Sequence, residues 1–305
     1  MLTQAQRAVL AARLRQGRTT GTQSSGNPIV QLNDGPAQRP LVVFHALGGT
    51  VYPYGHLARD LTGDFQVYGV LAPHGEPDAE GSLDALVARH LRVLRRIVPT
   101  GPYRLAGWSM GGVLAFEIAR RLAPDEVAFV GLLDAPFWLP DDPEPDDQQF
   151  AGLFVADAAR SLGPAQHTRP DPDTTSVNGQ LRWLAGQLDS NAEPEQLLPE
   201  LQRRYAAFRV STRVLAGYRP SGLLPADGLI IDVEESPNTS RLWRDVLLGS
   251  VRMCSLEGNH YSFLQPPLVS RVSALLRETD RQALPEFDGG YRQVPAVPSR
   301  TGDTG

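Results

Sequence analysis

Short apolar runs and longer stretches of helical periodicity alternate along the central part of the chain. The short runs are rich in β-branched and aromatic residues and predict strands at 41–44, 65–71, 103–106, 127–133, 229–233 and 251–256. Apolar positions three and four residues apart predict helices at 54–61, 83–98, 110–122 and 268–277. The run VAFVGLL has no polar face, which is typical of a strand that helices cover on both sides. The pattern predicts an α/β fold with a mostly parallel, doubly wound sheet.

This alternation breaks between residues 137 and 218. An acidic loop with prolines, DDPEPDD, precedes three stretches of helical pattern near 148–162, 177–189 and 195–216. These stretches carry the aromatic residues Phe150, Phe154, Trp183, Tyr205 and Phe208. A helical insertion inside an α/β sheet is typical of a lid over an active site. A packed helical subdomain without a gating role is the alternative.

The two ends of the chain differ in composition from the centre. Residues 1–18 have the pattern of a short amphipathic helix with arginines and no acidic residue, and 19–27 are typical of a flexible linker. A linker or docking helix fits this start better than an organelle transit peptide. The segment 284–305 is rich in Pro, Gly, Ser and Thr, which is typical of disorder. We therefore expect an N-terminal helix and linker over 1–27, a folded domain over 28–283 with a helical lid at about 137–218, and a disordered tail over 284–305.

Composition excludes several classes of protein. With 41% hydrophobic and 21% charged residues, the chain is not expected to be wholly disordered. Its net charge of −5 gives no general electrostatic argument for nucleic-acid binding. No apolar run is long enough to predict a transmembrane helix, so we expect no membrane partner. The single cysteine, Cys254, cannot form a disulfide within the chain, which favours a reducing compartment and a cytoplasmic protein.

The basic residues exclude further chemistry. All 29 are arginine, so a Schiff-base lysine and the lysine of a phosphate-binding P-loop are ruled out. No HExxH, CxxC or GxGxxG motif occurs, and the six histidines are scattered along the chain. We therefore expect no metal site and no bound cofactor.

The strongest local motif is GWSMG at 107–111, which is followed by Gly112. It lies between a predicted strand and a predicted helix, as the nucleophile elbow of a serine hydrolase requires. At such a turn, the residues two before and two after the serine crowd one another, and glycine at both positions removes the colliding Cβ atoms. Ser109 is therefore the candidate nucleophile.

A serine hydroxyl needs a base to take its proton. His260 directly follows the last predicted strand, where the hydrolase architecture places that base. The other five histidines lack this placement. His45 precedes Ser109 at the carboxyl end of the first core strand, so we expect it to shape a neighbouring loop.

Four carboxylates compete to orient this histidine. Asp134 ends the apolar strand VAFVGLL, whereas Asp232, Glu234 and Glu235 lie in or after the later strand at 229–233. A carboxylate that ends a fully apolar strand is costly to bury without a partner such as imidazole. This favours Asp134, although both strand ends can point a carboxylate at the histidine.

The negative oxygen of a tetrahedral intermediate needs two backbone N–H donors. One is predicted to be Met110, directly after the candidate nucleophile. The other is expected in the loop HALGG after the first core strand, where we favour Leu47 and keep Ala46 as the alternative.

Four motifs together resemble a known family. The segments FHALGGTVYPYGHLA, YRLAGWSMGG, VGLLDAP and EGNHYSFLQPP resemble the α/β-hydrolase thioesterase domains that end nonribosomal peptide and polyketide assembly lines. The resemblance covers about residues 28–278. It implies an α/β-hydrolase fold with a helical lid, and a triad acid at the position of Asp134. It also implies a substrate held as a thioester on the phosphopantetheine of a partner acyl or peptidyl carrier protein.

The resemblance implies a thioesterase of natural-product biosynthesis that releases an acyl, peptidyl or polyketidyl chain through an acyl-serine, by hydrolysis or cyclisation. Release domains resemble GWSxGG at the elbow, whereas freestanding editing thioesterases more often read GHSxGA. Trp108, Gly112 and Asp134 favour release. An editing thioesterase and a generic carboxylesterase are the alternatives. No carrier domain precedes the resemblance, which leaves open a freestanding enzyme and an excised terminal domain.

Overall fold

A computed structural model describes residues 27–73, 81–140, 142, 144–161, 176–188, 194–236 and 239–283. The predicted N-terminal helix, nearly all of the predicted linker and the predicted C-terminal tail lie outside these residues. Part of the acidic loop at 141–147 also lies outside them.

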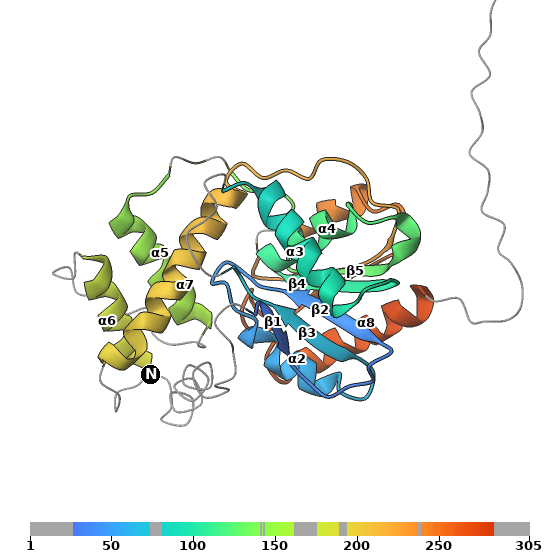
Figure 1. The fold of residues 1–305 in the computed structure, drawn as a ribbon, viewed down its shortest axis with the longest axis horizontal. Coiled ribbons are helices and arrows are strands. Elements are labelled where there is room, and N and C mark those ends of the chain that lie inside the picture. Colours follow the sequence, from blue (N-terminus) through green and yellow to red (C-terminus); the bar gives the residue numbers. More distant parts are fainter. Residues whose placement is uncertain are drawn as a thin grey trace, which may run out of the picture.

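A seven-stranded sheet forms the centre of the molecule (Figure 1). Its strands are β1 (Ile29–Gln31), β2 (Pro40–Phe44), β3 (Gln66–Val70), β4 (Tyr103–Trp108), β5 (Val127–Leu133), β6 (Asp227–Val233) and β7 (Val251–Leu256). Their order is β1-β3-β2-β4-β5-β6-β7, and every neighbouring pair is parallel except β1 with β3. The predicted mostly parallel sheet is confirmed. The sequence prediction missed β1, because three residues are too few to show a period of two.

Helices cover both faces of this sheet. They are α2 (Gly55–Asp60), α3 (Leu83–Ile97), α4 (Met110–Ala119) and α8 (Val269–Ala283), with short 3₁₀ turns at Tyr52–Tyr54, Pro124–Glu126 and Ser240–Asp245. In Figure 1, α3 and α4 lie on one face, and α2 and α8 lie on the other. Alternate residues of β2 enter separate cores, with Val42 in the α3–α4 core and Val43 in the α2–α8 core. This two-sided burial explains why the central strands are largely apolar.

The last helix, α8, continues beyond its predicted end at Arg277. Two polar residues beyond that point, Thr279 and Asp280, are buried, and Asp280 forms ion pairs with Arg104 on β4 and with Arg39. A buried carboxylate needs such partners because its desolvation is costly. An apolar periodicity cannot reveal a helical turn that is buried through charge pairing.

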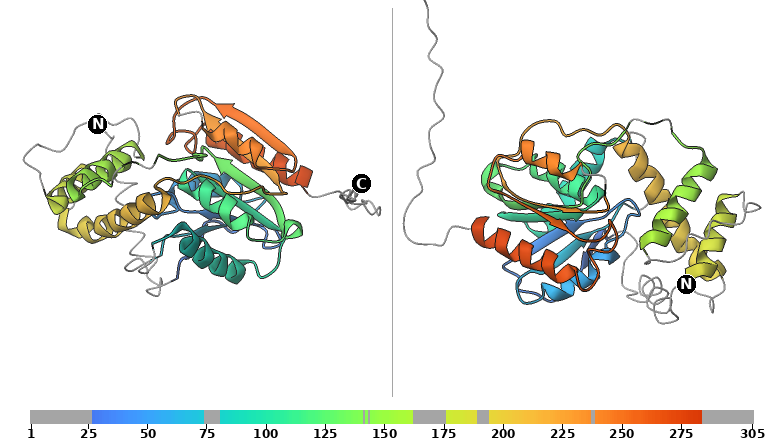
Figure 2. Two further views of the ribbon diagram at one scale, coloured as in Figure 1. Left: turned by 90° about the horizontal axis from the view of Figure 1, so that it is seen from above. Right: turned by 180° about the vertical axis from the view of Figure 1, so that it is seen from behind.

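Three helices form an insertion between β5 and β6, where the sequence predicts helical stretches. They are α5 (Asp147–Ser161), α6 (Val177–Leu188) and α7 (Pro194–Leu215). Figures 1 and 2 show them together to one side of the sheet. They have a core of their own, which includes the buried side chains of Phe150, Phe154, Tyr205 and Phe208. We call α5, α6 and α7 the helical insertion.

The parallel pairing places the carboxyl ends of β2, β4, β5, β6 and β7 at one edge of the sheet. The loops that leave this edge begin at His45, Ser109, Asp134, Glu234 and Glu257. Polar groups that lie far apart in the sequence can therefore meet there.

Candidate functional site

Ser109 lies on the sharp turn between β4 and α4. Its φ of 56° and ψ of −128° are strained for a residue with a side chain. Its backbone N–H donates to the carbonyl of Leu133 on β5. A Cβ atom on Gly107 would lie 2.0 Å from the backbone of Gly111, and one on Gly111 would lie 2.3 Å from the carbonyl of Phe44. The glycines are therefore required because backbone fills the space that a side chain would need.

Gly112 meets a similar restriction from a different strand. A Cβ atom there would lie 2.4 Å from the Cβ of Ala135 and 2.9 Å from the carbonyl oxygen of Gly107. Ala135 directly follows Asp134. The glycine at this position therefore lets the turn after β5 approach the start of α4.

Asp134 and His260 come together at this edge of the sheet. His260 Nδ1 lies 2.5 Å from Asp134 Oδ2, although the two residues are far apart in the sequence. Asp134 is only 4% exposed and has a φ of 46°, and its N–H donates to Ile231 on β6. The Ser236 hydroxyl donates to the same carboxylate oxygen at 2.6 Å. Two hydrogen bonds therefore hold this buried carboxylate.

The contact with Asp134 orients the imidazole. Because an ionised carboxylate only accepts hydrogen bonds, His260 Nδ1 carries the proton and Nε2 is the nitrogen that can receive one. The ring of Trp108, next to Ser109, lies 5.0 Å from the His260 ring between centroids, and the ring of Tyr261 lies 5.2 Å from it edge-on. The two aromatic rings thus pack the imidazole beside the turn that carries Ser109.

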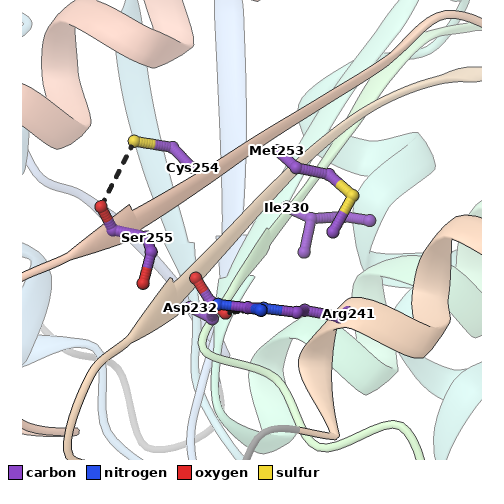
Figure 3. Close-up of a pocket in the computed structure, with 6 residues that line it drawn as sticks. All are labelled: Ile230, Asp232, Arg241, Met253, Cys254 and Ser255. Carbon is purple, nitrogen blue, oxygen red and sulfur yellow. Dashed lines mark hydrogen bonds and ion pairs between the residues drawn. The ribbon is translucent and has the colours of Figure 1, made fainter.

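The other candidate carboxylates do not make this contact. Asp232 is buried, and its Oδ2 accepts from Arg241 Nε at 2.7 Å. This pair lines a small pocket between β6 and β7 together with Cys254 and Ser255 (Figure 3). Glu234 and Glu235 are exposed. Asp232 therefore has an arginine as its partner, whereas Asp134 has the histidine.

The predicted oxyanion residues lie on two segments at the same edge. Met110 begins α4, and the first N–H groups of a helix have no intrahelical acceptor. Leu47 follows β2, and its side chain packs against both the α3–α4 core and the core of the helical insertion. The Ala46 carbonyl accepts from Gly49 N–H and contacts His45 Nδ1, each at 2.9 Å. The loop after β2 is therefore held by internal hydrogen bonds.

Tyr54 joins these two segments, and the sequence reasoning missed it. Its buried hydroxyl donates to the carbonyl of Phe44 and accepts from the N–H of Trp108, each at 2.7 Å. Burial raises the pKa of Tyr54, so the hydroxyl stays protonated. Ser236 was missed as well. Neither residue belongs to a motif, and a contact between distant segments leaves no local signal in the sequence.

Among the described residues, no group of three or more histidine, cysteine or acidic side chains could hold a metal ion. No helix in the described part of the chain is long and apolar enough to cross a membrane.

Comparisons with known proteins identify a family and relatives of this chain. A family model described as "Thioesterase domain" matches residues 39–278. The nonribosomal peptide synthetase btyA of Aspergillus terreus is 27% identical over 285 residues, which cover 85% of this chain and 30% of the synthetase. The dimodular nonribosomal peptide synthase of Bacillus subtilis is 25% identical over 279 residues, which cover 88% of this chain and 11% of the synthase. The chain thus spans less than a third of the length of these relatives.

Solved structures share the fold. A four-domain nonribosomal peptide synthetase matches with a TM-score of 0.68 and 22% identity, covering 87% of this chain and 21% of that protein. A wild-type structure of the Vlm2 thioesterase domain matches with a TM-score of 0.60 and 23% identity, covering 82% of this chain and 96% of that domain. The predicted α/β-hydrolase fold is confirmed.

The contact of Gly112 with Ala135 generates a stability prediction. Gly112→Ala forces a methyl group into occupied space, so we expect the free energy of unfolding to fall by about 2 kcal/mol. Gly186→Ala in α6 is the matched control, because a Cβ there meets nothing within 4 Å. Gly186 lies in the last turn of α6, so alanine there should raise stability by at most about 0.5–1 kcal/mol. Urea unfolding measures both changes, and a neutral Gly112→Ala would contradict the packing described.

Proposed function

Because the chain belongs to the thioesterase domain family, we propose that it releases an acyl, peptidyl or polyketidyl chain from the phosphopantetheine thioester of a carrier protein. The family and the α/β-hydrolase fold make the chain a hydrolase. The matched relatives are nonribosomal peptide synthetases, which supports a carrier-bound chain as the substrate. The GWSMGG elbow of this chain and the position of Asp134 also resemble the pattern of release domains, which read GWSxGG at the elbow.

The proposed reaction begins at Ser109. Its Oγ attacks the thioester carbonyl while His260 Nε2 takes the hydroxyl proton, and Asp134 stabilises the imidazolium that forms. The backbone N–H groups of Met110 and Leu47, with Ala46 as the alternative to Leu47, stabilise the negative oxygen. The carbon–sulfur bond then breaks, and the imidazolium returns its proton to the leaving thiolate. Water or a nucleophile within the chain resolves the acyl-serine by the same steps.

The observation that carries this proposal is the 2.5 Å contact between His260 and Asp134, packed against Trp108 beside the strained Ser109. A general base must be oriented by a third group and must lie next to the nucleophile. Paired carboxylate and imidazole groups next to an elbow serine fit acyl transfer through a covalent intermediate.

The proposed chemistry uses only side chains and backbone groups of this chain. The phosphopantetheine belongs to the partner carrier protein, so we propose no cofactor bound by the chain itself. We place the reaction in the cytoplasm, because the one cysteine, Cys254, is free.

We also propose that the helical insertion acts as a lid over the acyl chain. A hydrogen bond joins it to the segment that carries His260: the Tyr261 hydroxyl donates to Asp157 on α5 at 2.8 Å. The side chain of Leu47 also contacts the core of the insertion. A movement of the insertion would therefore reach both the base and the oxyanion loop.

A competition between two carrier-bound thioesters tests the function. Carrier proteins bearing acetyl or long peptidyl thioesters are mixed in competition, and intact-protein mass spectrometry follows the loss of each chain and any acyl adduct. A release enzyme should have a kcat/KM at least about tenfold higher for the long chain, because remote binding energy positions the carbonyl. Ser109→Ala should lose the adduct and about 10⁴-fold or more of the rate.

Three other results would contradict this function. Faster clearance of acetyl groups would indicate an editing thioesterase. Equal rates on free and carrier-bound esters would indicate a generic carboxylesterase. Full fluorophosphonate labelling of the Ser109→Ala variant would show that Ser109 is not the nucleophile.

Another prediction separates the two buried candidate acids, Asp134 and Asp232. Asp134→Asn removes the acceptor that orients His260, so kcat should fall by about 10³-fold or more while the fold survives. Asp232→Asn is the matched control, because its partner is Arg241, and it should keep more than about a tenth of the activity. Steady-state kinetics with a carrier-bound thioester measures both variants. The opposite ranking would assign the acid to the later strand.

A further prediction tests whether the helical insertion acts as a lid. Tyr261→Phe removes the hydroxyl that reaches Asp157 and keeps the ring beside His260. One hydrogen bond contributes about 1 kcal/mol, so kcat/KM for a long peptidyl thioester should fall by about fivefold, while the acetyl thioester should change by less than about twofold. Tyr68→Phe, which loses a hydroxyl contact with Gln66 on β3, is the control. An equal loss on both substrates would favour a purely structural insertion.

A further inference from the structure

Two buried histidines lie behind the oxyanion loop, and the proposed reaction uses neither. His45 directly follows β2 and His90 lies on α3, and their exposed fractions are 0% and 1%. His45 Nε2 lies 3.0 Å from His90 Nε2, with the rings edge-on. His45 Nδ1 lies 2.9 Å from the carbonyl oxygen of Ala46. Burying two imidazoles in an apolar core is costly, because polar groups lose their contacts with water. Their presence there therefore calls for a structural or functional explanation.

The contacts determine which ring nitrogens carry protons. A carbonyl only accepts hydrogen bonds, so His45 Nδ1 carries a proton. Burial lowers the pKa of His45 to about 4, so the ring is neutral and its Nε2 is an acceptor. His90 Nε2 must then carry a proton and donate to it. His90 is also neutral, because burial lowers its pKa, and its Nδ1 is an acceptor without a hydrogen-bond partner among the described residues.

These bonds act on one peptide unit of the loop. The carbonyl of Ala46 accepts from His45 Nδ1 and from the backbone N–H of Gly49. The same peptide plane carries the N–H of Leu47, and in a trans peptide the C=O and N–H bonds point in opposite directions. Two donors that hold the Ala46 carbonyl therefore also aim the Leu47 N–H away from them. This geometry favours Leu47 over Ala46 as the donor of this loop.

We infer that His90 is a positioning residue that acts through His45 to aim the Leu47 N–H at the oxyanion. His90 touches neither substrate nor the reacting atoms. It anchors the donor loop to α3, across the core, and it fixes the tautomer of His45. The inference rests on the proposed function, because it concerns the oxyanion hole of that reaction. Such donors act only within a narrow range of distance, about 2.7–3.1 Å from the oxyanion.

The test compares two replacements of His90. His90→Met has a similar length and no donor, whereas His90→Gln keeps an N–H group that can reach His45 Nε2. Complete removal of an oxyanion donor costs about 10²–10³-fold in kcat. A less accurate orientation of that donor should lower kcat by a smaller factor than its removal. We therefore expect kcat of His90→Met to fall about tenfold, with KM within about twofold of the wild type. His90→Gln should recover to within about threefold of the wild type.

A second measurement distinguishes a change in the orientation of the Leu47 N–H from a general loss of packing around His90. A peptidyl trifluoromethyl ketone adds to Ser109 and places a negative oxygen in the hole, so its affinity should fall in His90→Met by the same factor as kcat. Ser273→Ala, which removes a buried hydroxyl bonded within α8, is the control and should change neither quantity. Melting temperatures are recorded for every variant. A lower melting temperature with unchanged kcat and ketone affinity would overturn the inference in favour of packing alone.

Two further results would also overturn it. If His90→Gln behaves like His90→Met, the donated hydrogen bond has no role. The protonation pattern is tested on the wild-type protein by ¹⁵N nuclear magnetic resonance, which needs no folded variant. We expect the Nδ1–H tautomer for His45 and the Nε2–H tautomer for His90. The reverse tautomers would disprove the hydrogen bond that His90 donates to His45. If the wild type neither binds the ketone nor cleaves carrier-bound thioesters, the proposed function itself fails.

Discussion

Parallel pairing of β2, β4, β5, β6 and β7 is the constraint on which the candidate site depends. Backbone hydrogen bonds continue past the strand ends, since Ser109 N–H donates to Leu133 and Asp134 N–H donates to Ile231. These two hydrogen bonds hold each turn in place at the point where the chain leaves the sheet. Both residues then adopt positive φ values that the adjoining strands impose. The elbow serine and the buried carboxylate are therefore positioned by the backbone before any side chain contributes.

Buried and half-buried polar groups connect these turns to one another. Tyr54 bridges β2 and β4, Ser236 holds Asp134, and the pair of His45 and His90 reaches from the loop after β2 to α3. A buried polar group without a partner costs about 1–3 kcal/mol, so each of these contacts favours one arrangement of its neighbours. Polar bonds inside an apolar core thus give the site a rigidity that packing alone would not supply.

The helical insertion adds a second body next to this rigid edge. Its helices pack mainly around their own aromatic core. Its contacts with the site segments include those of Tyr261 and Leu47, and Arg204 of α7 lies over the ring of Tyr52. An element that is stable in itself and joined by few contacts can change position without disturbing the sheet. In this proposal the helical insertion selects the substrate, and the triad at the edge of the sheet carries out the chemistry.

Local patterns in the sequence were enough to predict the central strands, the helices between them and the elbow at Ser109. Each depends on local pattern, because alternation, helical spacing and glycines at 107 and 111 are properties of neighbouring residues. The sequence also limited the candidate acids to Asp134, Asp232, Glu234 and Glu235.

Which of these carboxylates faces His260 became clear only from the folded arrangement, in which Asp134 contacts His260 and Asp232 pairs with Arg241. It also revealed the roles of Tyr54, Ser236 and His90 as hydrogen-bond partners. Those side chains act across distances of tens of residues along the chain, and His45 and His90 are 45 residues apart. Contacts of this kind leave no periodicity and no motif, because they arise from how the strands and helices pack rather than from what each element is.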